Sequence, residues 1–219
     1  MNLLTYLPSL ASGIATTLAL TALSFAVGAV IALPVAMARS SRFRGLRLLA
    51  GGYIELVRGI PPIAWLFVLF FGLNQFQIRL NSFTAAVIGL GIISAGYIAE
   101  IYRAGFNAVP PGQREAASAL SLSSRTTFGT VVAPQALITV LPLAIAYFIG
   151  LLKDSAVASV IGVQDITTIA VSLSKRSLDS LTIFLAAGAV YLLISIPVAI
   201  LGSWIGDRVA QKWGARHAR

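Results

Sequence analysis

Five long stretches of this chain contain no Asp, Glu, Lys or Arg, and they constrain the fold more than any other feature of the sequence. A helix needs about 20 mostly apolar residues to cross a bilayer, and each stretch is long enough. Because a spanning segment must satisfy its backbone hydrogen bonds internally, the spans are expected to be helical. The sequence therefore predicts an all-α integral membrane protein. The uncharged stretches cover residues 1–38, 59–78, 80–99, 126–152 and 180–206.

The composition agrees with this prediction. Charged residues make up 11% of the chain and hydrophobic residues 58%, whereas a soluble domain carries about 25% charged residues. The first stretch is expected to be a span and not a cleaved signal peptide, because it greatly exceeds an apolar signal region of about 7–15 residues. We predict one transmembrane domain over residues 1–219, with spans at about 10–38, 56–74, 82–102, 131–152 and 181–206.

One further apolar segment and several prolines modify this outline. Residues 155–174 are interrupted by Gly162, Asp165 and several Ser and Thr, so we expect a re-entrant or interfacial segment and not a sixth span. Prolines break the helical hydrogen-bond ladder and bias the preceding residue away from helix. We expect interruptions of span two at Pro61-Pro62, of span four at Pro134 and Pro142, and of span five at Pro197.

The positions of Lys and Arg predict the orientation. Cytoplasmic loops carry an excess of basic residues. With the N-terminus outside and the C-terminus inside, the inner side holds twelve basic residues, and the outer side holds Arg79, Lys153, Lys175 and Arg176. The twelve are Arg39, Arg42, Arg44, Arg47, Arg58, Arg103, Arg114, Arg125, Arg208, Lys212, Arg216 and Arg219.

The same distribution explains the formal net charge of +9. In a soluble protein such a charge points to nucleic acid, but here it lies next to the membrane on one side, where it suits anionic lipid. Nucleic acid is therefore not an expected partner. The chain has no cysteine, and it has no phosphate-binding loop, zinc-protease motif or dinucleotide turn. We expect neither an enzyme nor a bound cofactor or metal.

The longest inner loop contains an unusual polar segment, Val109–Ser124, with the sequence VPPGQREAASALSLSS. Pro111 suits the first turn of a helix, and Glu115 near that end is favoured by the helix dipole. Ala116, Ala117, Ala119 and Leu120 give one small, mildly apolar face, and Ser123 and Ser124 can cap the next helix. The segment is either a stiff helix that another protein grips or a helix that lies on the membrane surface.

These residues resemble the EAA loop of ABC-importer permease subunits. That pattern is Glu-Ala-Ala, three residues, Gly, nine residues and then Ile-x-Leu-Pro. This chain has Glu115-Ala116-Ala117 and Pro134 at the same spacing, with Ser121 in place of the Gly, Val131 of the Ile and Ala133 of the Leu. Residues 53–73, 95–120, 133–137 and 151–167 are also similar, in order and spacing, to the polar amino-acid uptake branch of that family.

The resemblance implies five transmembrane helices of the type I importer kind, with a cytoplasmic coupling loop at 106–130 between helices three and four. It implies a bacterial cytoplasmic (inner) membrane location, a second permease subunit, a cytoplasmic ATPase dimer and an extracytoplasmic amino-acid-binding protein. By the same resemblance, Glu115, Ala116, Ala117 and Ser121 dock the ATPase. Ser121 stands where Gly would reach left-handed geometry more cheaply.

Ionisable residues inside spans are candidates for function. Glu100, near the inner end of span three, either pairs with Arg103 at i,i+3 or forms a wall of the translocation path. Lys153, Asp154 and the adjoining Ser155 follow span four at its outer end. The two charges there either meet the ammonium and carboxylate groups of an amino acid, or cap a helix end and pair with one another.

Two functions follow from these features. The first is the membrane subunit of an ATP-driven importer of a polar amino acid, with the ATPase activity in a separate subunit. The second is a membrane anchor or scaffold that recruits a cytoplasmic partner without transport. The expected helix breaks and the intramembrane Glu100 favour the first.

Overall fold

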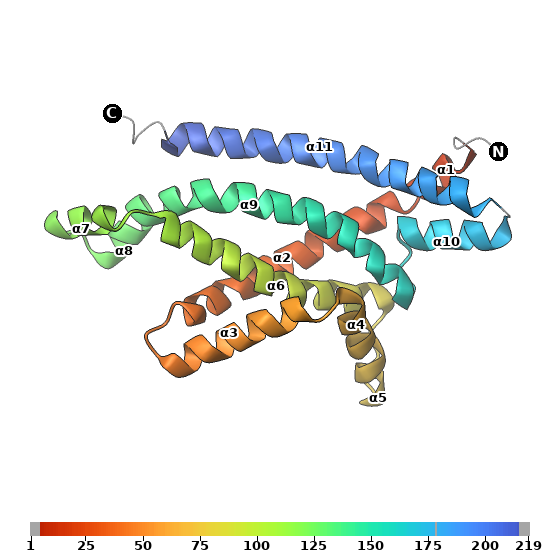
Figure 1. Ribbon diagram of the computed structural model, residues 1–219, viewed down its shortest axis with the longest axis horizontal. Coiled ribbons are helices and arrows are strands. Elements are labelled where there is room, and N and C mark those ends of the chain that lie inside the picture. Colours follow the sequence, from red (N-terminus) through yellow and green to blue (C-terminus); the bar gives the residue numbers. More distant parts are fainter. Residues whose placement is uncertain (1–4, 178, 215–219) are drawn as a thin grey trace.

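The structure is a computed structural model that describes residues 5–177 and 179–214, and the described part of the chain is helical with no strands (Figure 1). Four of its helical stretches are long and apolar enough to cross a membrane, and a bent pair of helices supplies a fifth span if it is counted as one. The four stretches are Leu7–Arg39, Ser82–Ala108, Ser124–Ile161 and Ser180–Lys212, and the bent pair is Arg44–Gly59 with Pro62–Gln75. The predicted all-α membrane fold is confirmed.

The centre of the bundle is the pair α2 (Ile14–Arg39) and α6 (Ser82–Ala108). Small residues let the two backbones approach closely. A Cβ added to Gly28 of α2 would lie 2.5 Å from the Cβ of Ser94, and one added to Gly91 of α6 would lie 2.7 Å from Val27 Cγ1. The other long helices are therefore arranged around a seam that has no space for an additional methyl group.

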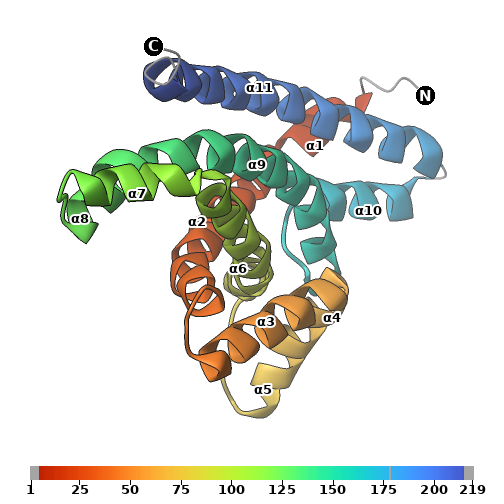
Figure 2. The ribbon, with the colours of Figure 1, turned by 60° about the vertical axis from the view of Figure 1, so that its left-hand side comes forward.

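Further helices flank this pair in layers. Across the molecule the order is α11 (Ser180–Gly214), α9 (Ala133–Asp154), then α6 and α2, and then α3 (Arg44–Gly59) with α4 (Pro62–Phe67), as Figure 2 shows. The helices α9 and α11 also approach each other closely, since a Cβ on Gly202 would lie 2.4 Å from Ile145 Cγ2.

The second span is broken sharply. Ile60 (φ −100, ψ 132) and Pro61 (φ −56, ψ 139) are extended, and the helix axes on either side are bent by 102°. The predicted span 56–74 straddles this break: its first residues end α3, while the rest forms α4, the π-helical η2 (Val68–Gly72) and α5 (Leu73–Gln75). The Pro61-Pro62 interruption is confirmed.

The prediction for span two missed α3. Its buried residues Ala50, Ile54 and Val57 face α2 and α6, while its exposed residues include three arginines and several leucines. Because apolar and charged positions alternate along one helix, the mean hydropathy of α3 falls although one face is buried.

The remaining prolines behave differently from the prediction. Pro134 lies in the first turn of α9, just after the π-helical η3 (Phe128–Val132), where its missing N–H costs little. Pro142 and Pro197 lie inside α9 and α11, and both helices continue through them. The expected interruptions at these two positions are wrong. Neighbouring helices and local adjustment satisfy the freed carbonyl groups in membrane bundles.

Residues 155–174 form two short pieces, as expected of a segment that is not a sixth span. The 3-10 helix η4 (Ser155–Ile161) ends at Gly162, whose φ of +85 is left-handed, and α10 (Ile166–Arg176) follows. Ala158 and Ile161 belong to a core cluster with Leu66 and Leu90, so η4 packs into the bundle.

A buried carboxylate begins α10. Asp165 is fully buried, and its Oδ1 accepts a 2.8 Å hydrogen bond from the Thr168 N–H, which caps the helix. The Tyr191 hydroxyl of α11 donates to Asp165 Oδ2 over 3.3 Å, and the Thr17 hydroxyl of α2 accepts from the Ile166 N–H. One capped turn thus ties α2, α10 and α11 together.

The two ends of the bundle differ in content. Figure 1 shows α7 (Pro111–Ala119), α8 (Ser124–Thr127), the turn between α2 and α3 and the C-terminal end of α11 at one end, which we call the basic end. The helices α1 (Leu7–Ala11) and α10 lie at the other. The segments that the sequence assigned to one side of the membrane therefore lie together; Arg216 and Arg219 fall outside the described residues.

The close contact of α2 and α6 can be tested with two Gly→Ala substitutions that are expected to change stability in opposite directions. We expect Gly28→Ala to lower the stability of the purified protein by about 1–3 kcal/mol, because the added methyl overpacks the seam. Gly188→Ala in α11 is the matched control. A Cβ there meets nothing within 4 Å, so the better helix propensity of Ala should leave stability unchanged or raise it by up to about 1 kcal/mol. Thermal unfolding in detergent measures both; equal shifts would contradict the seam.

Candidate functional site

The helix α7 is short and polar, and it connects α6 to the start of the fourth span. Pro111 occupies its first turn, as the sequence predicted. Glu115 lies in the second turn, and the first turn holds no acidic residue. Since the dipole effect fades beyond the first turn, the expected stabilisation of Glu115 by the helix dipole is not supported.

The N-terminal half of α7 is fixed to the bundle. Val109, just before it, forms a buried cluster with Val132 and Ala136, and Phe106 packs against that cluster. The side chain of Gln135 donates a 3.3 Å hydrogen bond to Gln113 Oε1. These contacts connect α7 with the last turn of α6 and with the start of α9.

The C-terminal end of α7 is closed by a Schellman turn. The Leu122 N–H donates to the Ala117 carbonyl over 3.0 Å, and the Ser121 N–H donates to the Ser118 carbonyl over 2.9 Å. Ser121 has a φ of 54, the left-handed conformation that the motif requires and that Gly reaches most cheaply. Ser therefore keeps the turn that the family pattern makes with Gly, at some cost in strain.

The turn sends the chain directly into the next helix. Ser123 is the N-cap of α8, and its hydroxyl accepts from the Thr126 N–H. The predicted role of this serine pair as a cap is confirmed at Ser123.

The exposed side of α7 differs from the predicted face. Ala117 is only 3% exposed and belongs to the bundle side of the helix. Glu115, Ala116, Ala119 and Leu120 are exposed, and we call them the α7 face. Leu120 is 74% exposed. The α7 face combines one carboxylate, two small residues and one bulky apolar side chain, which suits contact with a partner's groove.

The second candidate site lies on α6, within the third predicted span. Glu100 of α6 pairs with Arg103, whose Nη2 lies 2.7 Å from Glu100 Oε2. The Arg103 Nε adds hydrogen bonds of 3.2 and 3.1 Å to the two carboxylate oxygens. The i,i+3 ion pair that the sequence allowed is therefore formed.

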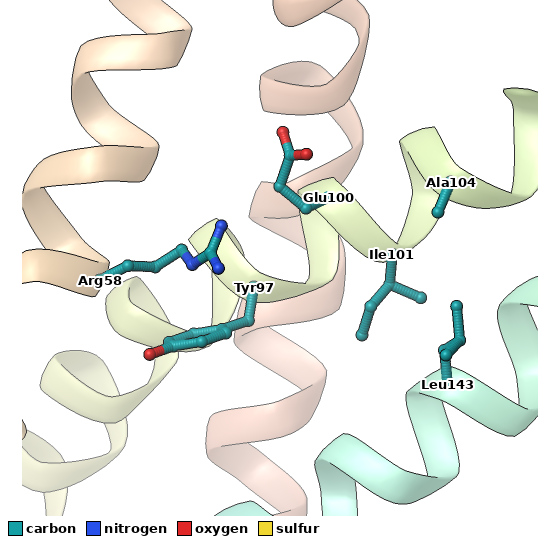
Figure 3. Close-up of a pocket in the computed structure, with 6 residues that line it drawn as sticks. All are labelled: Arg58, Tyr97, Glu100, Ile101, Ala104 and Leu143. Atoms are coloured by element: carbon teal, nitrogen blue, oxygen red, sulfur yellow. The ribbon is translucent and has the colours of Figure 1, made fainter.

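A cavity of ≈ 370 Å³ adjoins this pair, lined by Arg58, Tyr97, Glu100, Ile101, Ala104 and Leu143. Figure 3 shows the Arg58 side chain reaching from α3 toward α6, with Glu100 further along α6 and Leu143 on the facing helix α9. The Arg58 guanidinium carbon lies 5.1 Å from the centre of the Tyr97 ring, within the range of a cation–π contact.

The sequence grouped Arg58 with the inner loops. In the structure α3 carries it along α6 as far as Tyr97. The available signal was the spacing of Ala50, Ile54 and Val57, which is helical and would have extended the second span toward Arg44.

The other three predicted pathway residues lie where α9 ends. Lys153 and Asp154 are exposed, and in residues 5–177 and 179–214 they form neither an ion pair nor a side-chain hydrogen bond. Their mutual pairing is therefore not formed. Ser155 is fully buried, and its hydroxyl donates a 2.8 Å hydrogen bond to the Leu152 carbonyl.

The arrangement of broken second span, polar loop helix and five-span core is that of a type I ABC importer permease. The sequence profile of the "binding-protein-dependent transport system inner membrane component" family matches residues 28–211, and the chain belongs to that family.

Several known proteins that are similar to this chain are named as components of amino-acid transporters. The L-cystine transport system permease protein TcyB of Bacillus subtilis is 34% identical over 203 residues, which cover 92% of this chain and 87% of that protein. The arginine transport system permease protein ArtQ of Bacillus subtilis is 31% identical over 197 residues, or 90% of each. A crystal structure titled "an amino acid ABC transporter with histidines" is 36% identical and superposes with a TM-score of 0.86, covering 94% of this chain and 96% of that chain. These likenesses support an amino-acid ABC permease in the inner membrane.

The Schellman turn of α7 gives a test of its own. We expect Ser121→Gly to raise thermal stability slightly, because left-handed Ser costs roughly 1 kcal/mol that Gly does not. Ser121→Val should lower stability and transport, since a β-branched residue disfavours positive φ. Ser118→Gly, inside the right-handed helix, is the control and should destabilise. Equal tolerance of Gly and Val at 121, measured by melting and uptake, would contradict the turn.

Proposed function

We propose that this chain is the membrane-spanning subunit of an ATP-driven importer of a polar amino acid, and that the α7 face docks a separate cytoplasmic ATPase. The observation that carries the proposal is the combination of an exposed α7 face with a firmly held base. Glu115 and Ala116 are exposed, while Ala117 and Val109 are buried beneath them. A partner that grips this face can therefore move the helices below it.

Force on α7 is expected to reach two spans. Val109 follows α6 directly, and its buried contacts with Val132 and Ala136 lead into α9. When ATP draws the two ATPase subunits together, α7 shifts, and the inner ends of α6 and α9 shift with it. Coupling of this kind is reciprocal, so substrate delivery must also favour the ATP-bound state.

The proposal includes an orientation and partners. The basic end lies in the cytoplasm, with the N-terminus outside and the C-terminus inside, in agreement with the positive-inside rule. An ATPase dimer engages two permease subunits, of which this chain is one and an identical or similar chain the other. An extracytoplasmic binding protein delivers the amino acid to the end that carries α10. The transmembrane domain spans residues 1–219, and the coupling loop covers 106–130.

Glu100 is proposed to line the path between these ends. A charged side chain within the hydrocarbon region costs about 2.5–3.5 kcal/mol or more unless it faces protein or water. Glu100 and Arg103 are partly exposed in this chain, with 27% and 37% of their side chains accessible. This surface is therefore expected to face a water-filled path in the assembled transporter. Lys153 and Asp154 are proposed to meet the substrate at the outer entrance, and Ser155 supports their turn.

The alternative function is a membrane anchor or scaffold that recruits a cytoplasmic partner without transport. An anchor also explains the exposed α7 face. It does not explain the charged cavity between α3, α6 and α9, because charges within membrane-spanning helices lower stability without benefit to an anchor.

The docking role of α7 is tested by Glu115→Lys. We expect ATP-driven uptake into proteoliposomes to fall by about ten-fold or more, because a like charge in a docked interface is strongly unfavourable. The variant should still insert in the membrane, since Glu115 is exposed and makes no buried contact. Asp207→Lys is the matched control: it is an exposed carboxylate at the same end but on α11. Unchanged uptake by the Glu115 variant would refute the docking role.

The outer charges are tested separately. We expect Lys153→Gln and Asp154→Asn each to lower uptake by about ten-fold, since each removes a charged hydrogen-bonding group from the entrance. Co-purification of the ATPase should stay at the level of the unmodified protein. If the ATPase is lost in proportion to uptake, the two charges are structural and the entrance role fails.

A further inference from the structure

Arg58 is an exposed charged group of α3 that lies over the ring of Tyr97, at the edge of the cavity. Tyr97, beneath its guanidinium, is 11 residues from Ala108 and 15 from Ser82, the two ends of α6. At about 1.5 Å per residue it lies roughly 16 and 22 Å from those ends. Arg58 is therefore near the middle of a helix that crosses the membrane.

The nearby carboxylate is already used. Glu100 accepts three hydrogen bonds from Arg103. Within the described ranges, 5–177 and 179–214, no carboxylate oxygen lies within 4.0 Å of the Arg58 guanidinium. A guanidinium at this depth needs an anionic partner or water, and the ring of Tyr97 satisfies one face only.

One guanidinium, that of Arg58, and one carboxylate, that of Glu100, line the cavity, and further guanidinium groups lie near it. Arg39, Arg58 and Arg103 all act on the single carboxylate of Glu100. Three guanidinium groups against one carboxylate give an environment that attracts an anionic group and repels a second cation. The remaining lining residues, Ile101, Ala104 and Leu143, are apolar and offer no partner to a charged side chain.

The size and shape of the cavity suit a small molecule. Its volume of ≈ 370 Å³ is at the lower end of the range for ligand pockets, about 300–1,000 Å³. The planar fork of Arg is the side chain best matched to a carboxylate, which it can bind through two hydrogen bonds. The stacked rings of Tyr97 and Tyr147, with centres 5.2 Å apart, hold the surface under the guanidinium in place.

We propose that Arg58 binds the α-carboxylate of the amino acid during its passage, and that this cavity accepts net-neutral amino acids with uncharged side chains and disfavours basic ones. Glu100 receives the α-ammonium group, at the expense of part of its pairing with Arg103. The apolar wall of Ile101 and Leu143 receives the side chain. This inference rests on the proposed transport function and adds the residue and the charge class that select the substrate.

The test measures binding to the assembled permease–ATPase complex in nanodiscs, without a binding protein, so that selectivity belongs to the membrane subunit. The probes are radiolabelled methionine, glutamine, glutamate and arginine, each as the free acid and as the α-amide. The α-amide keeps the ammonium group but lacks the carboxylate. We expect the free acid of glutamine or methionine to bind on the order of ten-fold or more tightly than its amide. Arginine should bind on the order of ten-fold less tightly than glutamine.

The variants connect that preference with Arg58. Arg58→Gln should abolish the difference between acid and amide. Without the guanidinium, the α-carboxylate has no partner at this position, so replacing it by an amide removes no further interaction. Arg58→Lys should restore part of it, since the charge remains but the fork is lost. Arg47→Gln, an exposed arginine of the same helix, is the control and should keep the full difference. A merely structural role of Arg58 would weaken acid and amide equally.

Several results would overturn the proposal. They are an acid-over-amide preference that survives in Arg58→Gln, arginine binding as tightly as glutamine, and no binding of any probe at millimolar concentration. If Arg58 instead pairs with the second subunit or a lipid phosphate, Arg58→Gln will reduce complex assembly and leave the preference intact. The proposed function is judged separately, by ATP-driven uptake and its dependence on Glu115, so failure here does not depend on failure there.

Discussion

The close contact of α2 and α6 is the constraint on which the rest of the structure depends. It brings Gly28 against Ser94 and Gly91 against Val27 with no space for a further Cβ. Ser94 also accepts a 3.0 Å hydrogen bond from the Tyr147 hydroxyl of α9, and Gly96 leaves the space that Val57 of α3 occupies. In a membrane, where lipid is as apolar as the side chains, such van der Waals fit and polar contacts replace the hydrophobic effect as the basis of helix association. The helices that carry both candidate sites are positioned by this pair.

The two candidate sites are connected through the same helices. The path from the α7 face runs through Val109 into α6, and α6 carries Tyr97 and Glu100 on the way to its other end. The break at Ile60 and Pro61 lets α3 end beside Tyr97, so that Arg58 reaches the cavity. A movement of the basic end would therefore alter the cavity directly.

Predictions from sequence were most accurate where local physics decides the outcome. The uncharged stretches gave the long helices, the pair Pro61-Pro62 gave the break, and the proline and serines around α7 gave its start and the cap of α8. They failed where neighbours decide: Pro142 and Pro197 did not interrupt their helices. Asp165 does mark a break between two helices, as expected, but its burial and its contact with Tyr191 depend on α11.

The sequence by itself determined the class of fold, the number of apolar spans and the position of the EAA segment, because hydropathy, charge and turn chemistry are local properties of the chain. Only the tertiary structure decided that Ala117 faces the bundle while Ala116 faces outward, and that Arg58 lies beside Tyr97 at mid-span. Which side of a helix is covered, and how deep a charge lies, depend on the partners that pack against it. Those partners are distant in sequence, so no local pattern specifies them.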